Sequence, residues 1–93
     1  MGFMARVRIY TLVGCPYCAK AKSLLADYGV DFQELDVTQD EPMRAWLKMT
    51  TGKSTLPQTF IDGRPVGGFS DLEVLDKSGQ LALMLSRRRF APR

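Results

Sequence analysis

Residues 7–30, VRIYTLVGCPYCAKAKSLLADYGV, contain a strand signal followed directly by a helix signal. The first five residues, Val7–Thr11, are rich in β-branched and aromatic side chains and predict a strand. Gly14 breaks this strand, and Pro16 suits the first position of a helix, where its missing N–H costs nothing. Good helix formers then continue until Gly29, a residue typical of helix ends.

Outward from this stretch, the sequence predicts a second strand and a second helix. Residues 32–37 alternate enough between apolar and polar side chains for a strand, and the order strand–helix–strand implies a right-handed parallel crossover. Asp40 is a typical N-cap with Pro42 in the first turn, and Gly52 marks the end of this helix. One apolar stripe at helical spacing is expected to be buried and consists of Met43, Trp46 and Leu47.

A hairpin and a third helix are predicted next. The dipeptide Asp62-Gly63 is a strong hairpin signal between strands expected at 58–61 and 64–66. The run Ser70-Asp71-Leu72-Glu73 matches a capping box with a serine cap, so we expect it to open a helix.

The last helix signal is short and completes one domain. It consists of three apolar residues at helical spacing, Leu81, Met84 and Leu85. The 93 residues leave room for one hydrophobic core, so we expect a single domain over residues 1–93, with its core at about 6–86. The fold class is α/β, with a mixed sheet of about four strands and helices on both faces.

The net charge of +3 is unevenly distributed. Four of the thirteen basic residues lie in the tail at 87–93, and the other nine are balanced by ten acidic residues. This pattern favours a solvated tail over a nucleic-acid surface, which needs basic residues spread over a folded face. No run approaches the ~18 apolar residues of a membrane span, and no signal peptide is recognised at the start. We therefore expect a cytoplasmic, reducing location.

Two cysteines, Cys15 and Cys18, lie where the first strand passes into the first helix. The attacking species in disulfide chemistry is a thiolate, and the unpaired N–H groups and positive dipole end of a helix start favour that anion. Cys15 gains most from this position. Cys18 lies one turn further in, and residues at i and i+3 share a face, so the two sulfurs can bond. The pair therefore predicts redox catalysis in a reducing compartment.

Other sources of activation, and other uses of the pair, are weaker. The chain has no histidine, which excludes a Cys–His dyad and leaves the helix to stabilise the thiolate. Lys20 and Lys22 are weaker candidates, because side chains at these positions can point to solvent. A zinc site needs four ligands, usually cysteine and histidine, so no metal site is predicted within one chain. A fortuitous pair of buried cysteines is the remaining structural alternative.

Four motifs, in this order, resemble those of dithiol glutaredoxins, which belong to the thioredoxin-like superfamily. They are Tyr10-Thr11, Cys15-Pro16-Tyr17-Cys18, Thr55-Leu56-Pro57-Gln58 and Gly67-Gly68-Phe69-Ser70-Asp71-Leu72. The resemblance covers nearly the whole chain and implies a thioredoxin-like fold. It also implies an enzyme that reduces glutathione mixed disulfides and protein disulfides through its two cysteines, with glutathione as co-substrate and without a metal.

The resemblance further assigns roles in glutathione binding. It implies a cis bond before Pro57, which would present the backbone of Leu56 to the glutathione cysteine like an added strand. The γ-glutamyl carboxylate would lie at a helix N-terminus with Asp71 facing the ammonium group, and the glycine carboxylate would meet Lys53. The implied glutathione-binding residues are Tyr17, Lys53, Thr55, Leu56, Pro57, Gly68, Ser70 and Asp71.

The sequence departs from the family pattern at Leu12, where many members carry lysine, at Ser70, often aspartate, and at Leu56, more usually valine. Three other functions stay open: a redoxin regenerated by thioredoxin reductase, an iron–sulfur carrier that holds a cluster between two subunits, and a binding domain without activity. The implied glutathione site argues against the first. Pro16 and the second cysteine argue against the carrier, and the cysteine pair at a helix start argues against the third. A monomer is expected.

Overall fold

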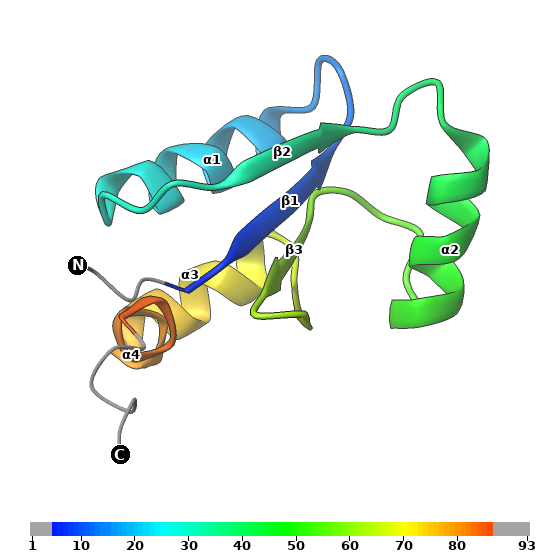
Figure 1. The fold of residues 1–93 in the computed structure, drawn as a ribbon. Coiled ribbons are helices and arrows are strands. Elements are labelled where there is room, and N and C mark those ends of the chain that lie inside the picture. Colours follow the sequence, from blue (N-terminus) through cyan, green and yellow to red (C-terminus); the bar gives the residue numbers. More distant parts are fainter. Residues whose placement is uncertain (1–4, 87–93) are drawn as a thin grey trace.

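The computed structural model describes residues 5–86 (Figure 1). Along the chain the elements are β1 (Val7–Thr11), α1 (Pro16–Asp27), β2 (Gln33–Asp36), α2 (Glu41–Thr51), β3 (Gln58–Ile61), β4 (Arg64–Gly67), α3 (Phe69–Lys77) and α4 (Gln80–Leu85). The predicted elements are therefore all present. The second strand is one residue shorter at each end than predicted, and β4 is one residue longer.

The strands described here form one mixed sheet in the order β2-β1-β3-β4. β1 and β2 are parallel and are joined by α1, as predicted, whereas β1 with β3 and β3 with β4 are antiparallel. Asp62 and Gly63 form the predicted turn, with φ of 53° and 82°. Positive φ at both positions is what an Asp-Gly hairpin turn requires.

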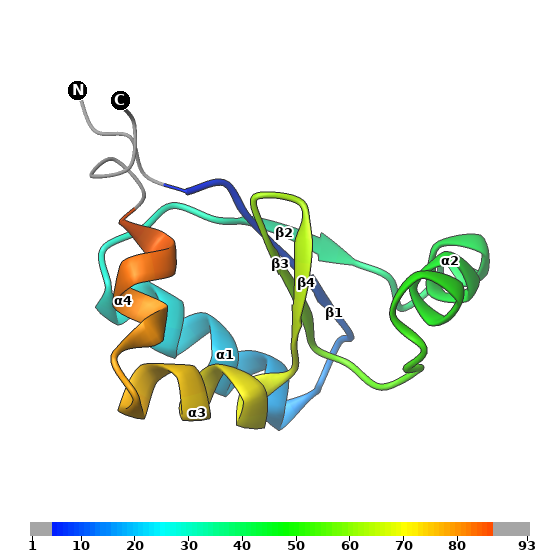
Figure 2. The same ribbon diagram turned by 90° about the horizontal axis from the view of Figure 1, so that it is seen from below.

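Helices cover both faces of the sheet, as predicted. Figure 2 shows α1, α3 and α4 on one side of the sheet and α2 on the other. Successive side chains of a strand point to opposite faces. Ile9 therefore belongs to the core under α1, α3 and α4, and Tyr10 belongs to the core under α2. The larger core comprises Ala5, Val7, Ile9, Ala21, Leu25, Val30, Ile61, Leu72, Leu81 and Leu85. The smaller core comprises Tyr10, Val37, Leu47 and Phe60.

The prediction that Trp46 is a core residue is wrong. Leu47 is buried and Met43 packs against the smaller core, but Trp46 remains 42% exposed. Its ring lies on the rim of this core, stacked on Phe60 with the centroids 5.9 Å apart, and 6.3 Å from the ring of Tyr10. The physical reason is the small width of the contact between α2 and the sheet, which encloses one residue of the stripe completely.

The third helix begins earlier than the predicted serine cap. Gly68 is the N-cap and Asp71 is the third helical residue, with its Oδ2 accepting a hydrogen bond from Gly68 N–H at 3.0 Å. Ser70 therefore lies inside the first turn instead of capping it. An aspartate in a first turn compensates the unpaired N–H groups and the positive dipole end there. Asp71 therefore caps the start of α3, a role that the predicted capping box gave to Ser70 and Glu73.

The expected basic tail at 87–93 lies outside the described residues. Among residues 5–86, no helix combines the length and apolar character needed to cross a membrane. The remaining boundaries agree with the caps inferred from sequence: Asp40 Oδ1 accepts from Met43 N–H at 3.1 Å, and Gly52 ends α2 in the left-handed conformation.

Candidate active site

Cys15 lies at the junction between strand and helix, as predicted. It is the N-cap of α1, and its Sγ accepts a hydrogen bond from the backbone N–H of Cys18 at 3.2 Å. Both cysteines are free thiols, Cys15 half-buried and Cys18 buried. The first-turn N–H groups of a helix favour a negative charge placed at the cap, and Cys15 is the cysteine whose sulfur is accessible at that position.

Cys18 is held in its protonated form. Burial, followed by the hydrogen bond and charge of Cys15, raises the pKa of the Cys18 thiol from its usual value to about 11. A backbone hydrogen bond from Leu12 and the charge of Lys22 act in the opposite direction. The two thiols are therefore unequal. Cys15 is accessible for attack, whereas Cys18 stays protonated.

The loop before β3 lies beside the Cys15 sulfur. The Leu56–Pro57 bond is cis, as the resemblance implies. Cys15 Sγ lies 3.8 Å from the carbonyl oxygen of Leu56. The side chain of buried Gln58 holds this loop in place. Its Nε2 donates hydrogen bonds to the carbonyl oxygens of Lys53 at 2.7 Å and Thr55 at 3.0 Å. The motif that contains Gln58 does not indicate this role; the burial of Gln58 at the first position of β3 and its two hydrogen bonds do.

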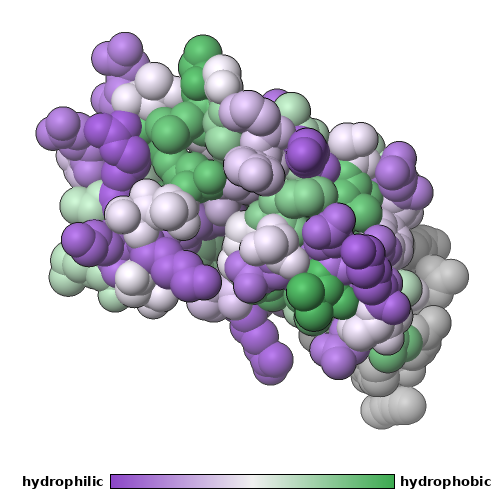
Figure 3. Space-filling model, turned by 180° about the vertical axis from the view of Figure 1, so that it is seen from behind, coloured by the Kyte–Doolittle hydropathy of each residue, from purple (hydrophilic) through white to green (hydrophobic). Residues whose placement is uncertain are grey.

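A groove of about 600 Å³ runs from the loop before β3 to the start of α3. All eight residues implied for glutathione binding line it: Tyr17, Lys53, Thr55, Leu56, Pro57, Gly68, Ser70 and Asp71. The structure adds Thr50, Thr51, Gln58, Pro65, Val66, Gly67 and Phe69. The two cysteines line a neighbouring hollow instead, and the contact of Cys15 with Leu56 joins the two. Viewed from behind, the surface intermixes apolar and polar side chains (Figure 3).

Opposite charges face each other in the groove. Lys53 Nζ lies 4.0 Å from Asp71 Oδ2, and the two side chains are 63% and 45% exposed. An exposed ion pair contributes only ~0.2–1 kcal/mol. A ligand that carries both a carboxylate and an ammonium group can therefore replace this pair at little cost.

Tyr17 forms an aromatic wall next to the cysteines together with Phe69. Their ring centroids are 6.3 Å apart, and Lys20 Nζ lies over both rings, at 5.3 Å from Tyr17 and 5.9 Å from Phe69. Phe69 was not predicted as a site residue, although it lies inside the quoted glycine motif. Lys20 thus covers the aromatic wall.

The turn between β4 and α3 needs glycine for two different reasons. Gly67 has φ of 105°, and a Cβ there would overlap the carboxyl group of Asp71. A Cβ on Gly68 would lie 3.2 Å from the carbonyl oxygen of Pro57. The glycines therefore allow the Asp71 cap to form and the start of α3 to approach the loop before β3.

Replacing Gly67 by alanine is expected to destabilise the fold by more than the left-handed backbone alone would, because Asp71 must also leave Gly68 N–H. Loss of a helix cap costs ~0.5–2 kcal/mol. Gly63→Ala is the matched control, because its φ is 82° and a Cβ there meets nothing within 4 Å. Urea denaturation of both variants measures the difference, and equal losses would contradict this role of Asp71.

The sequence and the structure of this chain are similar to those of known proteins. The family model described as Glutaredoxin matches residues 7–66. Glutaredoxin 3 of Escherichia coli (strain K12) is 45% identical over 82 residues, which cover 88% of this chain and 99% of the relative. The solution structure of glutaredoxin from Brucella melitensis has a TM-score of 0.82 at 45% identity and covers 91% of this chain and 92% of its own. The crystal structure of the buckwheat glutaredoxin–glutathione complex has a TM-score of 0.84 at 27% identity and covers 89% and 78%.

Proposed function

Since this chain belongs to the glutaredoxin family and is a glutathione-dependent thiol–disulfide oxidoreductase, we propose that Cys15 is its attacking sulfur and Cys18 its second thiol. The observation that carries the proposal is the place of Cys15. Its half-buried sulfur caps α1, accepts Cys18 N–H, and lies 3.8 Å from Leu56 O at the edge of the groove. The raised pKa of Cys18 supports the order of the two steps.

The proposed reaction begins when the Cys15 thiolate attacks the glutathionyl sulfur of a mixed disulfide. A new bond forms between Cys15 and glutathione, and the substrate sulfur leaves as a thiolate. A second glutathione then attacks this intermediate, which releases glutathione disulfide and restores Cys15. With a protein disulfide, Cys18 attacks instead and forms the Cys15–Cys18 disulfide, which glutathione later reduces.

We place glutathione along the groove, with its cysteine beside Leu56. The exposed backbone of the loop before β3 can pair with the extended tripeptide as a strand edge does. The start of α3 suits the γ-glutamyl carboxylate, Asp71 the ammonium group, and Lys53 the glycine carboxylate. The buckwheat relative, described as a glutathione complex, shares this fold and supports the assignment.

Trapping glutathione on the protein tests this placement. The Cys18→Ser variant, treated with glutathione disulfide, is expected to hold glutathione on Cys15. The largest changes in backbone amide chemical shifts are then expected at 53–58 and 67–71. Changes concentrated at 34–36, on the β2 side of the neighbouring hollow, would contradict the groove as the glutathione site.

Lys53 is expected to act in binding and not in the chemical step. Lys53→Ala should raise KM for glutathione substrates a few-fold with kcat nearly unchanged, because an exposed charge pair contributes ~0.2–1 kcal/mol equally to ground and transition states. Lys48→Ala is the matched control, because Lys48 is exposed on α2 and does not line the groove. Steady-state kinetics at low salt measure both variants, and an unchanged KM in Lys53→Ala would remove Lys53 from the site.

Leu12→Lys should act in the opposite direction, because it restores a cation that many family members carry. We expect KM for glutathione substrates to fall in this variant. Salt screens charges that are exposed to solvent, so the effects of Leu12→Lys and Lys53→Ala should both shrink at high ionic strength. A rise in KM for Leu12→Lys would contradict the position assigned to the glycine carboxylate.

The oligomeric state, the location and the partners also belong to the proposal. We infer a monomer that acts on glutathionylated and disulfide-containing proteins, without a nucleic-acid or membrane partner. Its location is the cytoplasm, a compartment where thiols are kept reduced.

Regeneration by thioredoxin reductase and a shared iron–sulfur cluster are the competing functions. Among residues 5–86 no group of three or more His, Cys, Asp or Glu side chains is placed to hold a metal. A purified protein without visible iron–sulfur absorption would support the dithiol enzyme.

A further inference from the structure

A second hollow, lined by both cysteines, adjoins the glutathione groove at the contact of Cys15 with Leu56. It is lined by residues of the β1–α1 loop, the first turns of α1 and the edge strand β2, among them Cys18, Lys22 and Glu34. Lys22 follows Cys18 by four residues on α1, so the two side chains share a face of the helix. The proposed reaction as described above uses neither charge.

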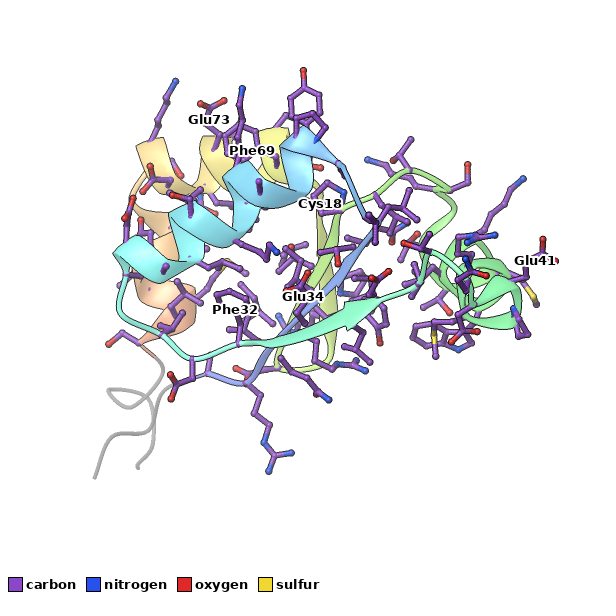
Figure 4. All side chains as sticks on the ribbon, turned by 90° about the horizontal axis from the view of Figure 1, so that it is seen from above. Cys18, Phe32, Glu34, Glu41, Phe69 and Glu73 are labelled. Atoms are coloured by element: carbon purple, nitrogen blue, oxygen red, sulfur yellow. The ribbon has the colours of Figure 1, made fainter. Side chains whose placement is uncertain are left out.

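Lys22 is fixed by a network that spans three elements. Its Nζ bonds both carboxylate oxygens of Glu34, at 3.1 and 3.0 Å, and Thr11 Oγ1 donates to Glu34 Oε2 at 2.8 Å. Figure 4 shows Glu34 on β2 beneath α1. The hydrogen bond from Thr11, and then the bond and charge of Lys22, hold the pKa of Glu34 below its ordinary value. Glu34 is therefore an anion that orients Lys22, and a poor acceptor for a thiol proton.

The electrostatic surroundings of Cys18 can be stated group by group. On α1 these are Cys15, whose charge opposes ionisation of Cys18, and Lys22, whose charge favours it. Glu34 and Asp36 of β2 line the same hollow. The β1–α1 loop contributes a backbone hydrogen bond from Leu12, which also favours ionisation. Lys22 is thus the cation that assists the thiolate of Cys18.

We propose that Lys22, oriented by Glu34 and Thr11, is a positioning residue for the step in which Cys18 attacks the mixed disulfide on Cys15. In that step the Cys18 proton goes to solvent and its sulfur bonds Cys15. The bond between Cys15 and glutathione breaks, and glutathione leaves as a thiolate with the electron pair. In this exchange the Cys18 sulfur is oxidised and the glutathione sulfur is reduced, while the Cys15 sulfur remains in a disulfide throughout. The inference rests on the proposed function, because it presupposes this intermediate.

The two partners of the ion pair should have opposite effects. Lys22→Met removes the cation and makes Cys18 harder to ionise, so the step should slow. Glu34→Gln keeps the size of the side chain but removes the anion beside Lys22, so the step should accelerate. A shift of one pKa unit changes the thiolate fraction tenfold, but nucleophilicity falls with pKa at a Brønsted slope of ~0.4–0.5, so about threefold is expected in rate. A purely structural ion pair would make both variants change in the same direction.

The test is a single-turnover reaction of the fully reduced protein with glutathione disulfide, followed by stopped flow across neutral and alkaline pH. The first glutathione released reports attack by Cys15, and the second reports attack by Cys18. We expect the pH profile of the second release to move to higher pH in Lys22→Met and to lower pH in Glu34→Gln. Both displacements should shrink at high salt, because Lys22 and Glu34 are each about one-third exposed.

Two controls separate the outcomes. Lys77→Met removes a similar cation at the end of α3 and should leave the profile unmoved. In the Cys18→Ser background, added glutathione attacks the mixed disulfide on Cys15 in place of Cys18. The rate of this attack should not respond in opposite directions to Lys22→Met and Glu34→Gln. Parallel shifts in Lys22→Met and Glu34→Gln, or none, with a normal first release, would overturn this inference alone. Absence of the first release in the unmodified protein would overturn the proposed function.

Discussion

The Cys15→Ser variant is expected to lose all activity, both on glutathione mixed disulfides and on protein disulfides. A serine hydroxyl does not form the thiolate that attacks a disulfide sulfur, and Cys18 is buried with a pKa of about 11. Neither substrate can therefore form the first covalent intermediate. Turnover with glutathione and glutathione reductase measures the first substrate, and reduction of a protein disulfide measures the second.

The same variant should fold normally. Cys15 is the N-cap of α1, a position that serine favours, and the new hydroxyl can accept Cys18 N–H as the sulfur does. A melting temperature near that of the unmodified protein would therefore assign the lost activity to the missing thiolate. Substantial activity of a folded Cys15→Ser protein would contradict the roles given to the two sulfurs.

The Cys18→Ser variant should separate the two kinds of substrate. Turnover of glutathione mixed disulfides should continue, because a second glutathione can attack the intermediate on Cys15 directly. Reduction of protein disulfides that need an internal second thiol should fall to a small fraction, because the intermediate between enzyme and substrate protein then persists. Non-reducing electrophoresis should detect that intermediate as a mixed-disulfide complex.

Cys18→Ala is the control for this experiment. The Cys18 side chain is 3% exposed, and serine would bring a hydroxyl group into that environment, where an unpaired polar group is costly. Alanine removes the thiol without adding a polar group. The two variants should therefore share the same loss on protein disulfides, even if their stabilities differ. If both lost turnover of glutathione mixed disulfides, Cys18 would be needed for the first attack as well.

The order of elements and the position of the cysteines could be predicted because they depend on local signals. Pro16 starts α1, Gly52 ends α2 in the left-handed conformation, and Asp62-Gly63 makes the hairpin turn, each for reasons contained in a few residues. The contacts between segments far apart in the sequence followed from the resemblance to a family, which implied that two loops and a helix start surround one groove. All of its eight residues line that groove.

The predictions for Trp46 and for the start of α3 were wrong because both features depend on tertiary packing. The stripe of α2 has the spacing of a buried face, but α2 contacts the sheet too narrowly to enclose Trp46. The start of α3 depends on the left-handed Gly67, which leaves room for the Asp71 carboxyl to reach Gly68 N–H. Neither the width of a contact nor the space around a turn can be derived from the spacing of residues.

The pairing of Lys22 with Glu34 shows the same limit. The sequence shows the charge of Lys22, but the direction of its side chain depends on how α1 packs over β2, and Lys22 and Glu34 are twelve positions apart. A basic residue at that point of an amphipathic helix is equally compatible with solvent. The position of β2 beside β1, in parallel register with Glu34 opposite Ile9, determines that Lys22 lies in the hollow beside Cys18.

The dependence of this activity on glutathione can be measured in one coupled assay. The reduced protein is given the mixed disulfide of cysteine and glutathione, and NADPH consumption is followed with glutathione and glutathione reductase, and separately with thioredoxin reductase alone. We expect rapid, saturable turnover in the glutathione system and little or none with thioredoxin reductase. Turnover supported by thioredoxin reductase but not by glutathione would contradict this dependence.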